Sequence, residues 1–451
     1  MPIRSLGYFL LSGYREEIRK VNTCGRDAHA TIGFTAVARY VSRVMNLTER
    51  RAWIALGIIM LVGFAVRLAW AIHQPSGEAQ IVRLPDQREY LDLGKHIFDS
   101  GLWMADPRFE QIVYAYRTPG YPLLVACCDA NPRIVRIAQC VLDCGTMLAI
   151  FLLARRWLSP GASVFAAGIY AVNPYAIFFC GLILSETLFT FMLCWGMAMM
   201  ILSDGPWPPG NKLLAWLGGG AMLALAILVR PGTILLPVVL GCAAALANRD
   251  VALTYRKKWP LPVIATMLLI TGLALFPWAA RNRWMVGSWV WTSTNDGITR
   301  YDGFNPDATG ASDQSFVQSM PWTRDMTEAG RSQYFGKMAD DWIVDHPSAA
   351  AQLAVVKIGR TWSPVPLSRE YGGKWIYWIA GLGYEAPLDI LVLAGLWKNN
   401  LSGSAKRVLV LPAIYFSIAA GLSVGSLRYR LPAEGPMAVI AASAARSVRR
   451  S

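Results

Sequence analysis

The chain has 451 residues, of which 54% are hydrophobic and only 16% are charged, against about 25% charged residues in an average soluble domain. Its apolar residues come in long blocks, which excludes a disordered chain and a string of soluble domains, and eight cysteines in this length exclude a small disulfide scaffold. The net charge of +14 would indicate nucleic acid binding in a soluble protein, but here its distribution fits membrane orientation. The sequence therefore predicts an all-α polytopic membrane protein without a nucleic acid partner.

A hydrocarbon core of about 30 Å needs roughly 20 apolar helical residues. Ten segments approach that length, so we expect about ten transmembrane helices. Asn173-Pro174 is expected to bend the third of them. The apolar run 121–128 is too short to span, and we expect an interfacial helix there. The ten ranges are 52–71, 134–154, 161–180, 183–202, 213–229, 232–247, 260–280, 375–397, 408–427 and 431–445.

The placement of lysine and arginine orients these spans. Residues 1–51 are rich in both and are expected to form a basic cytoplasmic leader, although a start-site extension without a function fits them equally well. Counting the spans alternately places two polar loops outside, 73–117 and 281–374. The chain then divides into the leader, a transmembrane module over 52–280 that includes the first outer loop, an extracytoplasmic loop region over 281–374, and C-terminal helices with a short basic tail over 375–451.

Polar residues near the outer ends of spans are the candidate functional groups, because such residues are costly at membrane depth. Asp86 lies near the start of an expected helix in the first outer loop, where pairing with the helix dipole is an alternative explanation. Arg117, next to Tyr116 and two prolines, suits a phosphate or carboxylate but also fits a snorkelling interfacial anchor. Glu186 lies at the outer mouth of the fourth span and could equally cap that helix.

Arginines at the outer ends of spans form a further group of candidates, since the positive-inside trend predicts few of them there. An anionic headgroup or phosphate would explain them, and pairing with loop carboxylates is the alternative. These arginines are Arg230, Arg281, Arg283, Arg428 and Arg430.

Several chemistries find no support in the sequence. It contains neither GxxxxGK[ST] nor GxGxxG, and none of its four histidines forms an HxxxH or HExxH site. The cysteines lack zinc spacing, so the sequence supports no cofactor and no metal site. Carboxylates within the spans are few and form no evident relay, which speaks against an ion-coupled transporter.

Short motifs along the chain resemble, in order, the polyprenyl-phosphate-dependent membrane glycosyltransferases of the GT-C fold. The resemblance is to the bacterial relatives of the protein O-mannosyltransferases and of the aminoarabinose transferase that modifies lipid A. The motifs are Asp86 with Tyr90, Tyr116-Arg117-Thr118-Pro119-Gly120-Tyr121-Pro122, Ala171-Val172-Asn173-Pro174, Leu184-Ser185-Glu186, Pro277-Trp278-Ala279-Ala280-Arg281-Asn282, Ser293-Thr294-Asn295-Asp296-Gly297, Asp345-His346-Pro347 and Arg428-Tyr429-Arg430-Leu431-Pro432.

The resemblance implies an enzyme of the bacterial inner membrane, with its active site facing the periplasm. Such an enzyme passes one sugar from an undecaprenyl- or dolichyl-phosphate carrier to a protein, lipid or glycan acceptor, with inversion. It implies Asp86 as general base or the base's orienting partner, with Glu186 as a supporting carboxylate. The expected substrate-binding residues are Tyr90, Tyr116, Arg117, Arg230, Arg281, Arg428 and Arg430.

Two departures from the family pattern concern a metal. Gln87 follows Asp86 where many relatives have an Asp-Glu pair, and Tyr116 stands where the aminoarabinose branch has an acidic residue. A divalent ion is therefore not supported. Two other functions remain open, a transporter or flippase of lipid-linked sugars and a non-catalytic envelope assembly protein.

Overall fold

The computed structural model describes residues 47–77, 84–202, 212–247, 261–367, 372–398 and 400–445. The chain divides into two compact units, 1–55 and 56–451. Of the first unit only 47–55, the first turns of α3, belong to the described residues, so most of the expected leader lies outside them. The second unit holds the elements that position the candidate site.

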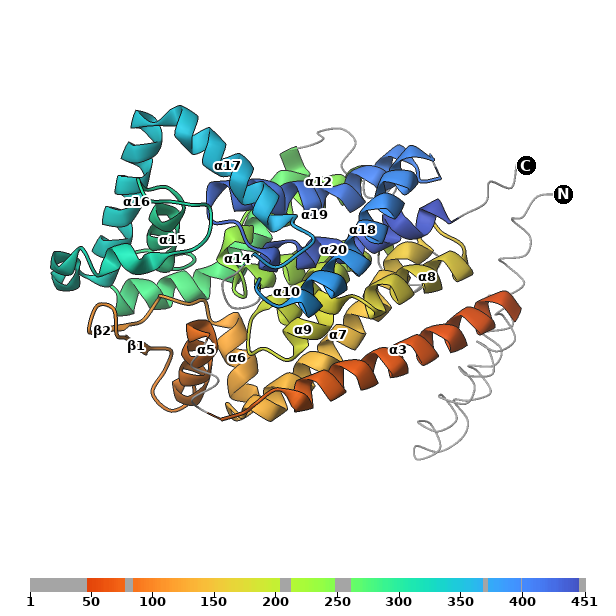
Figure 1. The fold of residues 1–451 in the computed structure, drawn as a ribbon, viewed down its shortest axis with the longest axis horizontal. Helices are drawn as coiled ribbons and strands as arrows, with labels where there is room; N and C mark the ends of the chain where they lie inside the picture. The colour runs from red at the N-terminus through yellow and green to blue at the C-terminus, as the bar shows by residue number, and fades with distance from the viewer. Residues whose placement is uncertain are drawn as a thin grey trace, which may run out of the picture. The chain divides into compact units, whose positions relative to one another are not determined.

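The all-α membrane architecture expected from the sequence is confirmed (Figure 1). Five helices of the described residues are long and apolar enough to cross a membrane. Three of them reproduce predicted spans with shifts of a few residues at their ends, and α18 has the predicted bounds. The five are α3 (Leu47–His73), α7 (Pro132–Arg155), α14 (Leu261–Met285), α18 (Trp375–Trp397) and α19 (Gly403–Leu422).

The third predicted span is bent, as expected. It consists of α8 (Pro160–Ala171) and α9 (Pro174–Cys180), which meet at 56° and raise the number of spans to six if counted as one. The Asn173 side chain accepts hydrogen bonds from the backbone N–H groups of Tyr175 and Ala176, and Pro174 occupies the first turn of α9. A capping residue followed by proline starts a new helix, which explains the break.

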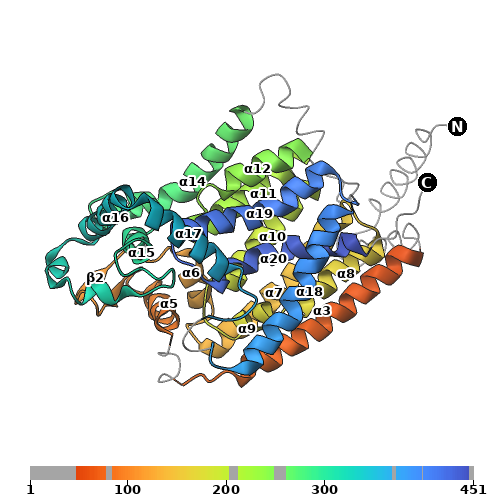
Figure 2. The same cartoon turned by 45° about the horizontal axis from the view of Figure 1, so that its top comes forward.

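The number ten is not confirmed, because four predicted spans are shorter than the roughly 20 residues that a bilayer requires. They are α10 (Glu186–Leu202), α11 (Lys212–Ile227), α12 (Leu236–Ala247) and α20 (Leu431–Ala444), with 17, 16, 12 and 14 residues. All fourteen residues of α20 are buried in the protein. Figure 2 shows α10 and α20 among the other helices of this unit.

Small residues let the helices approach α20 closely. A Cβ built on Gly395 of α18 would lie 2.2 Å from the backbone oxygen of Ile440, so only glycine fits at this contact. Helix α20 therefore belongs to the core of the transmembrane unit.

Helix α19 ends at Leu422, five residues before the predicted end of its span. Residues 423–430 form an irregular segment with a single 3-10 turn, η5 (Leu427–Tyr429). The Ser426 side chain accepts a hydrogen bond from the N–H of Arg428 and fixes the start of this turn. The difference matters because Arg428 and Arg430 lie on this segment and not at the end of a helix.

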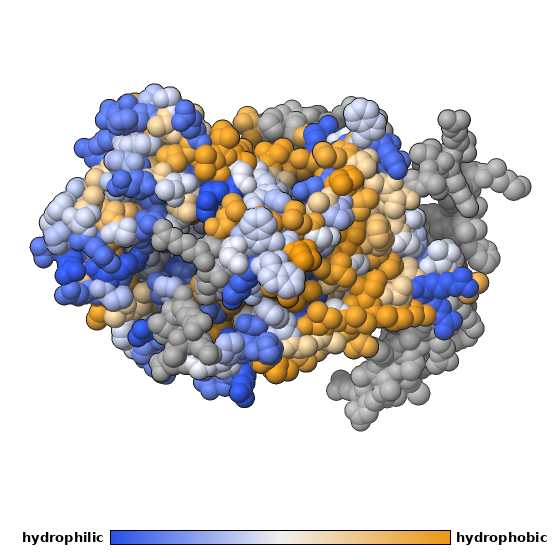
Figure 3. All heavy atoms as spheres, viewed as in Figure 1, coloured by the Kyte–Doolittle hydropathy of each residue, from blue (hydrophilic) through white to orange (hydrophobic). Residues whose placement is uncertain are grey.

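The two predicted outer loops are folded and share one hydrophobic core, which includes Phe109, Val113, Tyr301 and Phe335. The first loop contains α5 (Pro85–His96) and the antiparallel strands β1 (Met104–Asp106) and β2 (Gln111–Val113), which pair Met104 with Val113. The second contains α15 (Asn295–Gly303), η3 (Gln314–Val317), η4 (Pro321–Asp325), α16 (Glu328–Asp345) and α17 (Pro347–Thr361). In Figure 3 hydrophilic residues gather over the end formed by α15 and α16, while hydrophobic residues dominate the face of the helical part.

The short helix expected at 121–128 is present as α6 (Gly120–Cys127). It packs against α5, and Tyr121, Pro122, Val125 and Ala126 are buried in the protein. Helix α6 therefore packs against the helix of the first outer loop that carries Asp86.

Candidate active site

Asp86 connects two arginines that are far apart in the sequence. It lies in the first turn of α5, which Pro85 starts after the extended residue Leu84. Its Oδ1 accepts a hydrogen bond from Nη2 of Arg117 at 2.7 Å, and its Oδ2 accepts one from Nη1 of Arg428 at 2.7 Å. The helix dipole also favours a carboxylate here, but these two ion pairs are the dominant contacts.

Arg117 is held on four sides. Its Nε donates to Oε2 of Glu89 at 2.9 Å, one turn along α5 from Asp86. Its guanidinium lies 5.3 Å from the ring centre of Tyr90 and 5.2 Å from that of Tyr116. The side chain is 18% exposed, so the charge is largely enclosed by carboxylates and aromatic faces.

Arg428 joins this group to the transmembrane helices. Its Nε donates to Oε1 of Glu186, the fully buried first residue of α10. Nη1 of Arg230 lies 3.8 Å from the same oxygen and donates to the backbone oxygen of Arg428 at 3.3 Å. The other oxygen of Glu186, Oε2, is buried without a hydrogen-bond partner among the described residues.

Six charged side chains thus form one group, which we call the outer cluster. It contains three arginines and three carboxylates and is formally neutral. Its members are Asp86, Glu89, Arg117, Glu186, Arg230 and Arg428.

The surroundings of Asp86 shift its titration. Burial alone would raise its pKa, but the charges of Arg117 and Arg428 and their hydrogen bonds hold the pKa well below its usual range. The same ion pairs overcome the effect of burial on Arg117 and Arg428 and raise the pKa of both guanidinium groups. Asp86 is therefore ionised at any ordinary pH and is a weak proton acceptor as long as both arginines hold it.

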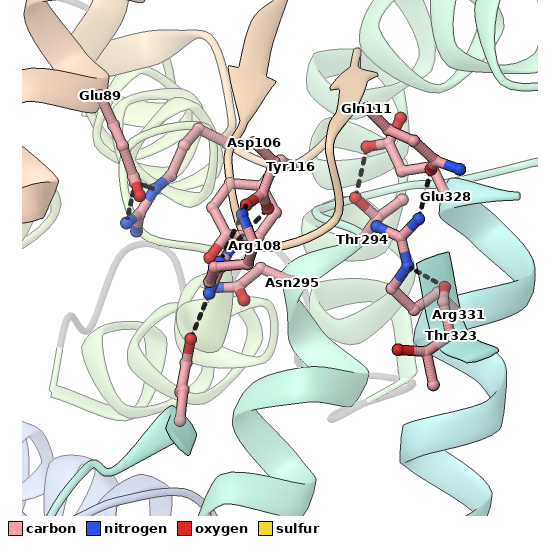
Figure 4. Close-up of polar contacts among 12 residues, drawn as sticks. Glu89, Asp106, Arg108, Gln111, Tyr116, Thr294, Asn295, Thr323, Glu328 and Arg331 are labelled. Atoms are coloured by element: carbon pink, nitrogen blue, oxygen red, sulfur yellow. Dashed lines mark hydrogen bonds and ion pairs between the residues drawn. The ribbon is translucent and has the colours of Figure 1, made fainter. Parts of the chain in front are cut away.

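The second outer loop fixes the backbone that precedes Arg117. Glu328, the first residue of α16, accepts hydrogen bonds from the N–H groups of Tyr114 and Ala115 at 2.7 and 2.9 Å. It also accepts one from Oγ1 of Thr294 at 2.6 Å (Figure 4). Oγ of Ser293 donates to the oxygen of Tyr116 at 2.8 Å. The 293–297 motif therefore positions the Tyr116-Arg117 segment.

Further contacts between the two loops surround this segment. The ring of Tyr116 also contacts a second guanidinium group, since that of Arg108 is 5.0 Å from its centre. Arg108 is bound to Asp106, and Arg331 to Gln111 and Thr323 (Figure 4). Arg108 also donates to Oε1 of Gln314 in the second outer loop. The first outer loop is thus joined to the second by charged side chains on both sides of Tyr116.

Two of the arginines predicted to bind a phosphate lie elsewhere. Arg281 donates to the backbone oxygens of Tyr114 and Leu102, so it binds the backbone of the first outer loop. Arg430 is fully buried and pairs with Glu385 and Glu434. Among the described residues, neither guanidinium pairs with a member of the outer cluster, so the structure does not bring Arg281 and Arg430 together with the other predicted site residues, and their role in phosphate binding stays a prediction. Arg283, at the end of α14, binds the oxygen of Gly287.

The structure brings seven of the nine predicted site residues together and adds Glu89 and Glu328 beside them. Glu89 follows Asp86 in the same polar stretch, which makes it an alternative base on sequence grounds, whereas nothing in the sequence distinguishes Glu328. Gln87, a departure from the family pattern, is buried, and its Oε1 accepts a hydrogen bond from the N–H of Ile183 at 2.9 Å. It ties α5 to the segment before Glu186. Across the part of the chain that the structure describes, no group of three or more His, Cys, Asp or Glu side chains is arranged to hold a metal ion.

Comparison with known proteins gives matches in family and in fold. Residues 123–278 match the family described as dolichyl-phosphate-mannose-protein mannosyltransferase. The oligosaccharyltransferase AglB of Archaeoglobus fulgidus, in complex with an inhibitory peptide and a dolichol-phosphate, has a TM-score of 0.50 and 14% identity, covering 87% of this chain and 50% of its own. The same enzyme tethered with an acceptor peptide gives 0.51 and 15%, covering 87% and 49%.

A third solved structure is ArnT from Cupriavidus metallidurans bound to undecaprenyl phosphate. Its TM-score is 0.38 at 13% identity, covering 87% of this chain and 77% of its own. The sequence matches no curated protein.

These matches confirm the GT-C fold that the motifs predicted, the fold of membrane glycosyltransferases. The chain spans about half the length of the oligosaccharyltransferase chains that it matches. The family match runs from α6 to α14 and includes Glu186 and Arg230, while Asp86, Arg117 and Arg428 lie outside it. The likeness defines the fold, so the chemistry has to be argued from the outer cluster.

Proposed function

We propose that the chain is a membrane glycosyltransferase that moves one sugar from a polyprenyl-phosphate carrier to a hydroxyl acceptor outside a bacterial inner membrane. The observation that supports this most strongly is the bridging of Arg117 and Arg428 by Asp86. It brings a carboxylate for the acceptor proton and two guanidinium groups for a phosphate to one place. The structurally similar AglB in complex with a dolichol-phosphate supports a lipid-phosphate carrier.

Binding of the carrier is an exchange of ion pairs. A phosphodiester carries one negative charge, and arginine binds phosphate oxygens through paired N–H groups. When the diester takes Arg117 and Arg428, Asp86 loses the two contacts that lower its pKa. The pKa of Asp86 then rises towards its usual range, and the carboxylate becomes a better proton acceptor at the moment when the sugar is present.

The transfer itself is a single displacement. The acceptor oxygen attacks the anomeric carbon, the bond from that carbon to the phosphate oxygen breaks, and its electron pair stays on the departing polyprenyl phosphate. The hydroxyl proton passes to Asp86, with Glu186 and Glu89 as the neighbouring carboxylates. Attack from the side opposite the leaving group inverts the anomeric centre. The phosphate gains a second negative charge, which Arg117, Arg230 and Arg428 stabilise.

The tyrosines keep this charge geometry in place. The rings of Tyr90 and Tyr116 flank the guanidinium of Arg117 and exclude water from two of its faces. A charge in such surroundings interacts more strongly with a phosphate than one in bulk water does.

The test is a panel of polyprenyl-phosphate sugars given to the purified protein in detergent or nanodiscs, with released polyprenyl phosphate as the readout. Release that depends on an added hydroxyl acceptor supports the proposal. Absence of release from every mannosyl, glucosyl, galactosyl and pentosyl donor in the presence of mixed envelope acceptors would contradict it.

One observation favours a transporter or flippase of lipid-linked sugars as a second candidate function. The span formed by α8 and α9 is broken, and Asn173 at the break binds Glu434 in the interior. Glu434 is itself paired with Arg430 and buried, which argues against an open path. Proteoliposomes with a labelled lipid-linked sugar separate the two functions. A flippase moves the labelled lipid from one leaflet to the other without releasing polyprenyl phosphate, whereas a glycosyltransferase releases it.

A further inference from the structure

Three consecutive residues of the irregular segment 423–430 contact two different parts of the protein. Arg428 binds Asp86 and Glu186 in the outer cluster. The ring of Tyr429 lies 5.0 Å from the guanidinium of Arg230. Arg430 points away from the outer cluster into the transmembrane helices. The segment therefore connects the candidate active site to the interior.

The contacts of Arg430 join four elements. Its Nε donates to Oε1 of Glu434 in α20 at 2.7 Å, and its Nη2 donates to Glu385 in α18. Its Nη1 lies 3.3 Å from the oxygen of Ser363, after α17. Asn173, at the break between α8 and α9, donates to the other oxygen of Glu434. We call Arg430, Glu385 and Glu434 the inner cluster.

The inner cluster is enclosed by protein. The side chains of Arg430, Glu385 and Glu434 are 1%, 0% and 0% exposed, so a ligand does not reach them from solvent. The guanidinium of Arg430 also lies 5.2 Å from the ring centre of Trp362 and 5.9 Å from that of Tyr175. In such an environment an ion pair has one good geometry, and its partners cannot shift without losing it.

The rest of the segment is held to other elements by few hydrogen bonds. Gly425 donates its N–H to the oxygen of Gly310 at 2.8 Å, and Ser426 donates its N–H to Oγ1 of Thr361 at 3.3 Å. Between these contacts and α20 the backbone N–H groups make the bonds of one short 3-10 turn. Arg428 and Arg430 attach this stretch to the helices by ion pairs, Arg428 to Glu186 in α10 and Arg430 to residues of α18 and α20.

We propose that Arg430 is a positioning residue that acts through Arg428, an inference that rests on the proposed function. The inner cluster fixes the position of the backbone just before α20. It thereby fixes the position of the Arg428 guanidinium relative to Asp86 and the carrier phosphate. A displacement of about 1 Å at such a site is enough to cost about 100-fold in rate.

The alternative is that the inner cluster merely stabilises the helices. The chain offers a matched comparison, because Arg67 and Asp143 form another buried ion pair in the transmembrane unit, 0% and 2% exposed. Arg67 donates to the oxygen of Ala171, and Tyr170 donates to Oδ1 of Asp143 at 2.7 Å. These bonds join α3, α7 and α8 to one another and leave segment 423–430 untouched.

The test compares two variants in which all charges of a buried group are removed together, so that no charge is left alone. The inner-cluster variant is Arg430→Met with Glu385→Gln and Glu434→Gln, and the control variant is Arg67→Met with Asp143→Asn. We expect the first to lower kcat/KM for the donor about 100-fold, with the KM for the acceptor unchanged. The control should leave both constants unchanged in the folded fraction. Arg430→Lys, which keeps the charge but has a single donor group, should fall between the wild type and the triple variant.

A double-mutant cycle with Arg428→Ala shows whether the effect passes through Arg428. If it does, the inner-cluster changes should cause no further loss in the Arg428→Ala background. Multiplicative losses, or equal losses in the control variant, would overturn the inference. Binding of undecaprenyl phosphate gives a readout without turnover, and it should weaken in parallel. A wild-type protein that releases no polyprenyl phosphate contradicts the proposed function, whereas unchanged carrier binding in the inner-cluster variant contradicts this inference alone.

Discussion

Nη1 of Arg428 lies 2.7 Å from Oδ2 of Asp86, although 342 positions separate the two residues in the chain. The contact joins the first outer loop to the irregular segment between α19 and α20. Because Asp86 uses its other oxygen for Arg117, the first outer loop and the segment that leads into α20 meet at one carboxylate. A substitution of Asp86, Arg117 or Arg428 should therefore change the ion pairs of the other two residues.

Arg117 is predicted to bind the carrier phosphate. Arg117→Ala removes a charged hydrogen-bond donor worth about 1.5–3 kcal/mol and leaves Asp86 and Glu89 with excess negative charge. Affinity for undecaprenyl phosphate should therefore fall about 10- to 100-fold, measured by titration in nanodiscs.

The control for this variant is Arg300→Ala. Arg300 forms an exposed ion pair with Asp340 in the second outer loop, and both side chains are 51% exposed. Such surface pairs contribute little, so carrier affinity and folding should stay as in the wild type. Unchanged affinity in a folded Arg117→Ala variant would remove Arg117 from the phosphate site.

Glu328 is predicted to hold the backbone before Arg117. Glu328→Gln weakens the hydrogen bonds to the N–H groups of Tyr114 and Ala115, since a neutral amide oxygen replaces a carboxylate. We expect a loss of about 1–3 kcal/mol in unfolding free energy and a higher KM for the donor. Thermal unfolding and initial rates measure the two effects. A Glu328→Gln protein with wild-type stability and KM would show that these bonds do not position Arg117.

Lys357 is predicted to lower stability at neutral pH. Its amine is fully buried without a hydrogen-bond partner among the described residues and lies 3.2 Å from the ring centre of Phe304. Burial lowers the pKa of Lys357 to about 8, despite the opposing effect of Asp302. Between about pH 8 and 10 the unfolded chain holds a proton on this lysine that the folded chain has lost, so stability should rise with pH.

Lys357→Met tests this prediction, because it keeps the length of the side chain and removes the amine. The variant should be more stable than the wild type by about 1–3 kcal/mol at pH 7. Its stability should also lack the rise between about pH 8 and 10. A wild-type protein whose stability falls through this range, with no difference in the variant, would contradict the low pKa.

The orientation of the chain is predicted from its arginines and lysines. Asp307, exposed in the second outer loop, should be labelled as Asp307→Cys by an impermeant reagent in intact cells with a permeable outer membrane. The matched control is Gly161→Cys, at the expected inner end of the third span, where an added Cβ has open space. It should react only after the inner membrane is opened. The reverse pattern would invert the topology.

The sequence was sufficient for the class of fold and for most of the outer cluster. Long apolar runs predict helices, and polar residues at their ends point to a site. It could not predict that α20 is buried over its whole length, because a buried helix and a lipid-facing one have the same composition. The expected count of ten spans is likewise not confirmed, since five helices of the described residues, or six spans with the bent pair, are long and apolar enough to cross a membrane.

The partners of individual arginines could not be predicted either. Arg428 and Arg430 are two residues apart and have the same chemistry, yet one joins the outer cluster and the other the inner cluster. Both residues lie on the segment that follows the early end of α19, where no regular helix predicts the direction of a side chain. Such a choice depends on tertiary contacts that no local pattern records.

The central claim is that Asp86 and the arginines it bridges carry out sugar transfer, and the most direct test is turnover of Asp86→Asn. This variant keeps the shape of the side chain and removes the proton acceptor. Release of polyprenyl phosphate should fall by about 10²–10⁴-fold. Carrier binding should be at least as strong as in the wild type, because Arg117 and Arg428 lose a competing charge. Glu186→Gln should have a smaller effect. Wild-type turnover in Asp86→Asn, together with an inactive Glu186→Gln, would contradict this assignment and make Glu186 the base.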